Sequence, residues 1–258
     1  MVSLIINLKD SIERRAEMNH QISFLRDVNP EFIEAVDGRK MTELQRKEMF
    51  DIKSFKRLYS KNVRPGEIGC TLSHQKCYRE IIKKKLPYAL ILEDDAIITD
   101  VERTHQVLSD LNELFSESHE PIVVLLSSWF WYLGNYSQIN NTKFVKVYDG
   151  FSTYAYVVNN EAASCMIEER PFVTADDWFY WKKKGVRVLA VLPHVISHPT
   201  DESIPSTVSN APNEKISFKA MFKYVFIHFR RLLLRKVLMI IGRYEKYAPV
   251  DSCCKHSN

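Results

Sequence analysis

Three consecutive carboxylates follow an apolar run in the stretch YALILEDDAI, residues 88 to 97. The run predicts a buried strand, so Glu93, Asp94 and Asp95 would stand at its carboxyl end. Two hard carboxylates one residue apart, such as Glu93 and Asp95, can hold Mg²⁺ or Mn²⁺. An ion there could bridge the two phosphates of a nucleotide-sugar and stabilise the diphosphate as it leaves. A solvated turn with surface acids is the alternative interpretation.

Other phosphate-handling motifs are missing or incomplete in the sequence. Neither G-x-G-x-x-G nor G-x-x-x-x-G-K-[ST] occurs, so a Rossmann site and a P-loop both lack their glycine cradle. A phosphatase of the haloacid dehalogenase type needs Asp-x-Asp with a nucleophilic first Asp, whereas this chain has Glu93 there, or pairs Asp94 with Ala96. A metal-dependent phosphohydrolase stays an alternative hypothesis, as does a non-catalytic membrane-surface adaptor with a transferase-like domain.

The elements that must position these acids alternate between strands and helices. The early strands are continuous apolar runs, which is typical of a mainly parallel sheet covered by helices on both faces. The sequence therefore predicts an α/β fold. Ligands of such sheets sit beyond the carboxyl ends of the strands, where Asp37, the acidic trio and Ser127-Ser128 fall. We expect strands at 3–8, 32–38, 88–93, 121–128, 144–150, 152–159 and 186–192, and helices at 10–25, from 42 onward, and at 64–85, 101–117 and 160–169.

Two capping boxes mark expected helix starts. Asp10 is followed by Glu13, and Thr42 is followed by Gln45, each at the spacing of a side chain that caps the first turn.

Four blocks, in this order, resemble glycosyltransferase family 25: INLKDSIERR, EAVDGR, RPGEIGCTLSHQKCYREII and YALILEDDAII. The resemblance continues through TYAYVVNNEAA, TADDWF and ESI, and covers about residues 3–205. Its specific part is Gly-Glu-Ile-Gly-Cys-x-Leu-Ser-His followed by Leu-Glu-Asp-Asp. That family contains bacterial lipooligosaccharide galactosyl- and glucosyltransferases. It implies a GT-A fold, a nucleotide-sugar donor, usually a divalent cation, and inversion at the anomeric carbon.

Carried over residue by residue, the resemblance implies a donor site. Glu93 and Asp95 correspond to the family's metal and diphosphate motif. Since the generic motif has Asp where this chain has Glu93, Asp95 is the firmer metal ligand and Glu93 can instead contact the nucleotide. The implied cofactor is Mn²⁺ or Mg²⁺, and the implied donor is a UDP-sugar. The residues expected to bind the donor are Asn7, Arg14, Asp37, Glu67, Ser73, His74, Glu93 and Asp94.

Some of these residues have a second interpretation. His74, in the middle of an expected helix, also suits a satisfied and partly buried histidine. Asp37 suits a base, a ribose contact or a plain turn, and Arg14 suits a solvated helix face. His194 and His198 follow the last expected strand, where some GT-A enzymes supply a third metal ligand.

An inverting transfer needs a base that takes the proton from the acceptor hydroxyl. The block TADDWFYW supplies Asp176 and Asp177 beside aromatic side chains that could stack on sugar rings. We expect one of the pair to be the base, with a slight preference for Asp177. Either acid could instead cap a helix, and one can cap while the other reacts.

The C-terminal segment differs in composition from the rest of the chain. Residues 216–247 combine a helical stripe of apolar residues with eight lysines and arginines, against a nearly solitary Glu245. This pattern predicts a helix lying in an anionic membrane interface, and packing on the body is the alternative. The expected organisation is a transferase domain at 1–205, a linker at 206–215 and a basic amphipathic tail at 216–258. The stripe comprises Phe218, Met221, Phe222, Val225, Phe226, Phe229, Leu232, Leu233, Val237, Ile240 and Ile241.

Composition and charge limit the remaining function classes. The chain has 258 residues and a net charge of +4, too small and too concentrated in one segment to indicate nucleic-acid binding. The five cysteines fit neither a disulfide framework nor a zinc site, and the N-terminus is not a signal peptide. We therefore expect a cytoplasmic enzyme, peripheral on the inner membrane of a bacterium, that transfers galactose, or else glucose, to a lipooligosaccharide outer-core sugar.

Overall fold

A computed structural model describes residues 1–116, 118–199 and 218–245, and this part of the chain contains eleven strands and eight helices. The strands are β1 (Val2–Asn7), β2 (Asn29–Glu34), β3 (Tyr88–Glu93), β4 (Ile97–Ile98), β5 (Ile122–Leu125), β6 (Phe130–Ile139), β7 (Thr142–Gly150), β8 (Ala155–Asn159), β9 (Arg187–Leu192), β10 (Ile196–Ser197) and β11 (Tyr244–Glu245). The helices are α1 (Ile12–Ser23), α2 (Glu43–Met49), α3 (Ile52–Tyr59), α4 (Pro65–Lys83), α5 (Val101–Ser116), α6 (Asn160–Met166), α7 (Trp178–Lys183) and α8 (Phe218–Ile240).

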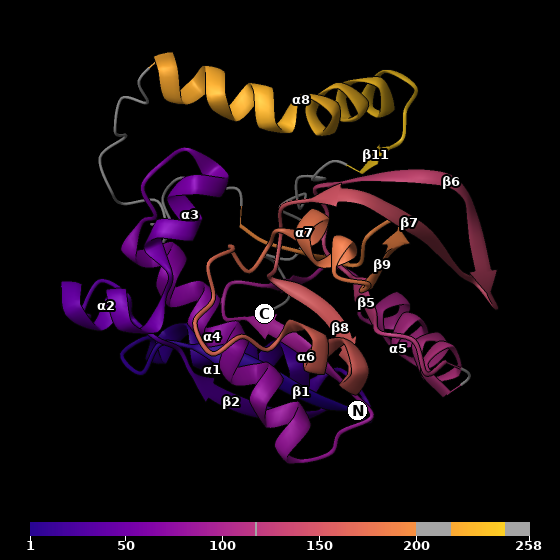
Figure 1. Cartoon of the computed structure of the whole chain (residues 1–258). Helices are drawn as coiled ribbons and strands as arrows, with labels where there is room; N and C mark the ends of the chain where they lie inside the picture. The colour runs from indigo at the N-terminus through magenta and orange to yellow at the C-terminus, as the bar shows by residue number, and fades with distance from the viewer. Residues whose placement is uncertain (117, 200–217, 246–258) are drawn as a thin grey trace.

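Nine of these strands form one sheet in the order β11-β6-β7-β9-β5-β8-β3-β1-β2 (Figure 1). β1 pairs in parallel with β2 and β3, and β5 pairs in parallel with β9. β8 lies antiparallel between β3 and β5, and β7 and β11 also run against their neighbours. Six of the nine strands therefore point the same way, which confirms the predicted mainly parallel α/β sheet.

Helices cover both faces of the sheet, as the unbroken apolar strands predict. Along β3, Ala89 and Ile91 join one buried cluster while Leu90 and Leu92 join the other, because successive side chains of a strand point to opposite faces. Helices α4 and α6 pack in the first cluster, and α1 and α5 pack in the second.

The strand order reverses direction at β1. From β1 the chain crosses to β2 on one side, and its later strand β3 returns to the other side. Crevices at such switch points, outside the carboxyl ends of the strands, are where open α/β sheets bind ligands. Asn7 and Glu93 are the last residues of β1 and β3, so both stand at this crevice.

Several local predictions differ from the structure. The Thr42–Gln45 capping box is present at α2, but α1 begins after Ser11 with no side-chain cap, and Asp10 instead contacts Lys40. β2 ends at Glu34, so Asp37 lies in the loop that follows the strand. The strand β6 was not predicted, because most of its outer half is exposed and lacks an apolar alternation.

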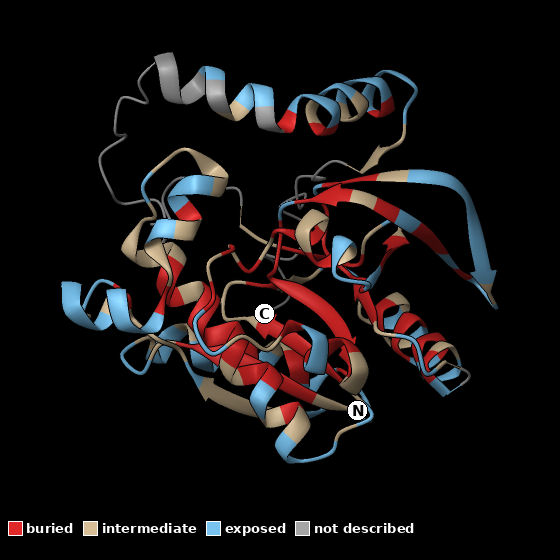
Figure 2. Cartoon of the chain, in the orientation of Figure 1, coloured by how far each residue is buried: buried red, intermediate tan, exposed pale blue. Residues whose placement is uncertain are grey.

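The C-terminal helix α8 packs on the body on the side of α3 and β6 (Figure 1). Arg231 makes two hydrogen bonds of 2.7 Å to the fully buried Asp149 of β7, and β11 extends the sheet beside β6. Figure 2 shows the buried positions of α8 on the side that faces the body. The packing alternative therefore holds for one face of this helix.

The opposite face of α8 is apolar and exposed. The inward positions Tyr224, His228, Arg231, Arg235 and Leu238 follow helical spacing, and most of them are polar. Across the described part of the chain, no helix has both the length and the apolar character to cross a bilayer. The expected linker 206–215, the ESI block, and Cys253-Cys254 lie outside the described residues. The outward apolar side chains are Phe222, Val225, Phe226, Phe229, Leu233, Val237, Met239, Ile240 and Ile241.

Candidate active site

The acidic trio forms the turn that follows β3, and its three carboxylates have different partners. The amide of Ala96 donates to the carbonyl of Glu93 at 3.1 Å and closes the turn. Asp94 turns toward β1 and α1, where Asn7 Nδ2 donates to its Oδ2 at 2.8 Å and Arg14 Nη1 contacts its Oδ1 at 3.2 Å. Asn7 also donates to the carbonyl of Ser11 at 3.1 Å. Asp94 therefore ties the ends of β1 and β3 to the first turn of α1.

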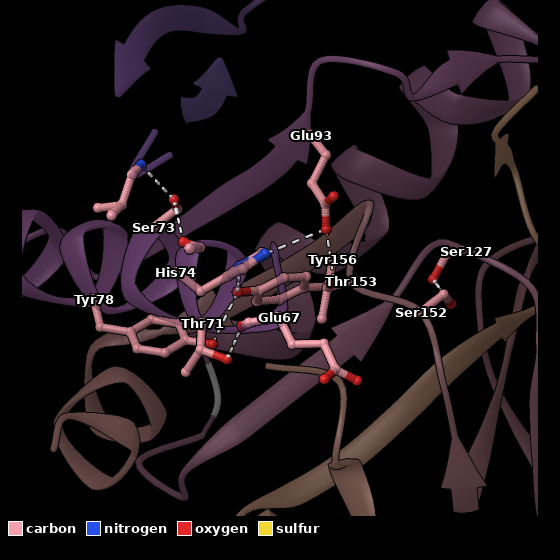
Figure 3. A network of polar contacts seen from close by, with 12 residues as sticks. Glu67, Thr71, Ser73, His74, Tyr78, Glu93, Ser127, Ser152, Thr153 and Tyr156 are labelled. Atoms are coloured by element: carbon pink, nitrogen blue, oxygen red, sulfur yellow. Dashed lines mark hydrogen bonds and ion pairs between the residues drawn. The ribbon is translucent and has the colours of Figure 1, made fainter. Parts of the chain in front are cut away.

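Glu93 is held by a chain of buried polar groups (Figure 3). Thr153 Oγ1 donates to Glu93 Oε1 at 2.6 Å, and His74 Nε2 lies 3.3 Å from the same oxygen. His74 Nδ1 lies 2.8 Å from the hydroxyl of Tyr156, which is 2.9 Å from that of Tyr78. Burial alone would raise the pKa of Glu93, but the hydrogen bonds and charge of His74, with the bond from Thr153, lower it. Glu93 is thus kept ionised beside the crevice.

Asp95 has a buried oxygen without a partner. Within the described residues its Oδ1 accepts no hydrogen bond. Burial, with the nearby charges of Glu93 and Asp94, raises the pKa of Asp95 to about 7. An unsatisfied buried carboxylate oxygen is unfavourable, and a bound cation removes that penalty.

A cavity of about 230 Å³ lies directly against this carboxylate. Glu93, Asp95 and His198 line it together, and its floor includes Thr153 and Tyr154. Two carboxylates and an imidazole fit Mn²⁺ or Mg²⁺, which prefer oxygen-rich ligand sets. Of the two histidines predicted as a third ligand, only His198 lines this cavity. His194 instead contacts Glu245 of β11 at 2.7 Å.

A softer set of donor atoms lies on the other side of Glu93. The candidate ligand atoms of Cys70, His74 and Glu93 lie within 4.8 Å of one another. Burial raises the pKa of the Cys70 thiol well above its ordinary value, so this sulfur is protonated. A thiol is a soft ligand, so the Asp95 side of Glu93, which offers two carboxylates, is the better match to a hard cation.

The loop after β2 and the start of α4 form the other wall of the crevice. Asp37 is held in a two-point contact by Arg39, at 2.8 and 2.9 Å, and these hydrogen bonds lower its pKa. Ser73 accepts from the amide of Val36 at 2.9 Å and donates to the carbonyl of Gly69 at 2.7 Å. A side chain on Gly69 would stand 2.4 Å from the carbonyl oxygen of Val36, which explains a glycine there. Arg14, Asp37, Ser73, His74, Glu93 and Asp94 line one small cavity.

A separate cavity, of about 340 Å³, contains the other acidic pair, Asp176 and Asp177. Glu67 lies here and not beside Asp94, and its carboxylate contacts the backbone amide of Arg64 at 2.7 Å and Lys61 at 2.6 Å. Tyr224 and Arg231 of α8 complete the wall. Phe151 borders this cavity and also the cavity that contains Asp95, so the two spaces adjoin.

The two acids of this pair have different surroundings. Asp177 caps α7, since its Oδ1 accepts from the amide of Tyr180 at 3.2 Å. The hydroxyl of Tyr59 donates to its Oδ2 at 2.5 Å, and Arg231 lies 3.2 Å from Oδ1. Asp176 is half-buried, and desolvation, with the charge of Asp177, raises its pKa to about 6 against a hydrogen bond with Thr174. Capping thus falls to Asp177, while Asp176 has the pKa of a group that exchanges protons near neutrality.

Of the four aromatic residues expected to stack on sugars, two are in the core, and Phe179 and Tyr180 are half-buried. Trp178 is fully buried and donates from Nε1 to the carbonyl of Ser152 at 2.9 Å, and Trp181 is 3% exposed. The expectation was wrong for these two, because helical spacing turns them toward the sheet. The exposed aromatic side chains at the cavities are Trp129 and Phe151, which no sequence motif had indicated.

The site combines an ionised carboxylate at the end of β3, a neighbouring carboxylate with one unpartnered oxygen, and an adjoining acidic cavity. These features suit an α/β transferase. A family model described as glycosyltransferase family 25 (LPS biosynthesis protein) matches residues 1–179, and the chain belongs to this family. α8, which completes the wall of the cavity that contains Asp176, lies beyond the matched residues.

The curated relatives that match this chain are longer proteins, and only part of each aligns with it. It is 28% identical over 182 residues to human procollagen galactosyltransferase 2, covering 65% of this chain and 27% of that protein. It is 27% identical over 224 residues to a glycosyltransferase 25 family member of Aedes aegypti, covering 81% of this chain and 31% of that protein. The chain thus spans about a third or less of these relatives.

Among solved structures, one similar fold is that of Drosophila β-1,4-galactosyltransferase 7 in complex with manganese, UDP-Gal and xylobiose. The TM-score is 0.43 at 10% identity, over 97% of this chain and 83% of that chain.

Proposed function

We propose that this glycosyltransferase moves a hexose, galactose first and glucose second, from a UDP-sugar to an outer-core sugar of lipooligosaccharide, with inversion. The observation that carries the proposal is the buried and unpartnered Oδ1 of Asp95, beside ionised Glu93 at the β1–β3 switch point. Family membership supports the transferase chemistry, and the galactosyltransferase relatives support galactose as the first choice.

The donor is proposed to occupy the crevice between β1, β3 and α4. Asp95 and Glu93, with His198, would hold Mn²⁺ or Mg²⁺, and the bound ion would neutralise charge on the leaving diphosphate. Arg14 lies at the same crevice and offers positive charge to a phosphate. Asn7 and Asp94 fix the turn that aims the carboxylates, and Ser73 and Asp37 shape the facing wall.

Asp176 is proposed as the base, in place of the slightly preferred Asp177. Both oxygens of Asp177 already accept hydrogen bonds or ion-pair contacts that hold α7, α3 and α8 together. Asp176 lies in the same cavity with a pKa of about 6, so it is largely unprotonated at neutral pH and still a competent proton acceptor. It would take the proton from the acceptor hydroxyl as that oxygen attacks the sugar carbon.

The exposed face of α8 is proposed to bind the cytoplasmic surface of the bacterial inner membrane. Phe226 and Ile240 are 77% and 82% exposed, and Arg230 and Lys236 flank the apolar stripe with positive charge. An apolar face bordered by cations fits an anionic lipid surface. Since α8 also walls the cavity of Asp176, a membrane-bound acceptor would arrive beside the reacting groups.

The decisive experiment is UDP release from UDP-galactose and UDP-glucose, with and without de-acylated lipooligosaccharide, and with Mn²⁺ or EDTA. We expect release that needs both acceptor and cation, and a loss of about 10²-fold or more in Asp95→Asn, because a metal ion supplies several kcal/mol of charge stabilisation. Lys143→Ala, a residue that lines neither cavity, is a surface control. Phosphate release without acceptor would indicate a phosphohydrolase, and no turnover with any UDP-hexose would indicate the adaptor.

A further inference from the structure

Trp129 combines an unusual backbone with an exposed side chain. Its φ is +68°, in the left-handed region that bulky residues rarely adopt. The other non-glycine residues with positive φ in the described chain are polar or charged. The Trp129 side chain is 43% exposed, whereas its neighbours Ser128 and Phe130 are fully buried. The strained turn therefore takes a large aromatic side chain out of the core and presents it to solvent.

The surrounding structure holds this conformation on both sides. The amide of Trp129 donates to the carbonyl of Glu245 in β11 at 3.1 Å, and its carbonyl accepts from the amide of Phe151 at 3.1 Å. The amide of the preceding Ser128 donates to the hydroxyl of Tyr154 at 3.0 Å. Strain that a structure fixes so firmly is typical of functional positions.

Trp129 borders the cavity that contains Glu93 and Asp95. Phe151, 39% exposed, borders the same cavity and also that of Asp176. Trp129 thus lies beside the carboxylates proposed to hold the cation, and Phe151 is shared between that cavity and the cavity of the proposed base. Aromatic side chains with a polar group nearby are the usual lining of small-molecule sites.

We propose that Trp129, with Phe151 beside it, is the platform on which the sugar ring of the acceptor stacks. The inference rests on the proposed transferase function and adds a specificity-determining residue to it. A hexopyranose presents one face rich in C–H groups, which packs on an indole while its hydroxyls remain free for polar contacts. The acceptor is favoured over the donor sugar because Trp129 opens to solvent, where a long glycan enters, and because Phe151 continues the surface toward Asp176.

Intrinsic fluorescence tests the platform without any turnover. The other three tryptophans, Trp131, Trp178 and Trp181, are 6%, 0% and 3% exposed, so acrylamide should quench mainly Trp129. Lactose and methyl β-galactoside serve as acceptor probes, and UDP with Mn²⁺ serves as the donor-side probe. We expect the glycosides to protect the accessible fluorescence and Trp129→Phe to remove that signal. Protection by UDP alone, or by neither probe, would overturn the assignment.

Kinetics and stability supply the second arm. Trp129→Ala should raise the acceptor KM by about tenfold or more, since stacking and burial together exceed 1.4 kcal/mol, while the donor KM stays unchanged. Trp129→Gly should raise the acceptor KM as much as Trp129→Ala does. Its Tm should be no lower than that of Trp129→Ala, because glycine adopts positive φ without strain. Tyr136→Ala removes an aromatic side chain that is 51% exposed outside both cavities, and should change neither constant.

The two proposals fail in different ways. Transfer activity with an unchanged acceptor KM in Trp129→Ala would refute the platform and leave the transferase intact. Glycoside protection of Trp129 in a protein that turns over no UDP-hexose would refute the transferase and leave a sugar-binding surface.

Discussion

Replacing Arg231 tests how α8 is attached to the catalytic body. Its guanidinium makes two 2.7 Å hydrogen bonds to Asp149, which is fully buried, and lies 3.2 Å from Asp177. Burial opposes the charge of Arg231, but Asp149 and Asp177 hold its pKa above the ordinary value. Arg231→Ala would leave the Asp149 carboxylate without its principal counter-ion in the protein interior.

The expected loss follows from the burial of the pair. Removing one partner of a buried ion pair costs about 3–5 kcal/mol. Arg235 Nη1 lies 3.7 Å from Asp149 Oδ2 and can compensate in part, so we expect the low end, about 3 kcal/mol. For a chain of this size that corresponds to a Tm decrease of roughly 6–12 °C.

Thermal and urea unfolding of matched variants measure this loss. Arg230→Ala, on the exposed side of the same helix, should stay within about 0.5 kcal/mol of the parent protein. Arg231→Met combined with Asp149→Asn should recover part of the stability, because the fully buried Asp149 position then carries no charge, although Asp177 still loses its contact with Arg231. If Arg231→Ala were as stable as Arg230→Ala, the docking of α8 described here would be wrong.

Four further predictions concern the acidic pair and the outer face of α8. Asp176→Asn should lower kcat by about 10²–10⁴, whereas Asp177→Asn should mainly lower Tm through the lost α7 cap; kinetics and melts of both variants check this. Since the pKa of Asp176 is about 6, kcat/KM should rise about tenfold per pH unit below that value and level off above it, and persistence of this limb in Asp176→Asn would contradict the assignment. The pH dependence of folding stability should run the opposite way, because the folded protein binds the Asp176 proton more tightly than the unfolded chain does. The stability that this proton contributes is fully present below about pH 4 and is lost as the pH rises through 6. Phe226→Asp with Ile240→Asp should abolish co-sedimentation with phosphatidylglycerol vesicles at unchanged Tm; retained binding would exclude the outer face.

The sheet and the strand-end position of the acidic trio could be predicted because their signals are local. The run that ends in Glu93 is a strand since its central residues, 89 to 92, are apolar and buried on both faces, and a strand end in such a sheet is a ligand position. The Thr42–Gln45 box is likewise a contact between residues three apart. These features depend on short stretches of chain, which a single sequence displays directly.

The roles of individual acids could not be predicted, because they depend on partners distant in sequence. Asp94 is engaged by Asn7 and Arg14, 87 and 80 residues away, and Asp177 is engaged by Tyr59, 118 residues away. Adjacent carboxylates look alike in sequence and differ only after folding. Trp129 gave no signal either, since a left-handed backbone at a tryptophan matches no turn preference.

The orientation of α8 shows why an amphipathic pattern does not by itself say which face is inside. The usual expectation would turn the stripe of Phe226 and Phe229 toward the core, yet that stripe is exposed and Arg231 is buried. The reason lies on the body, where Asp149 is fully buried on β7 and requires a cation. Once Arg231 meets that requirement, helical geometry leaves the apolar residues outward, and they need another partner. Because the same arginine borders the cavity of Asp176, the contact that orients the face proposed to bind lipid also completes the cavity proposed to receive the acceptor.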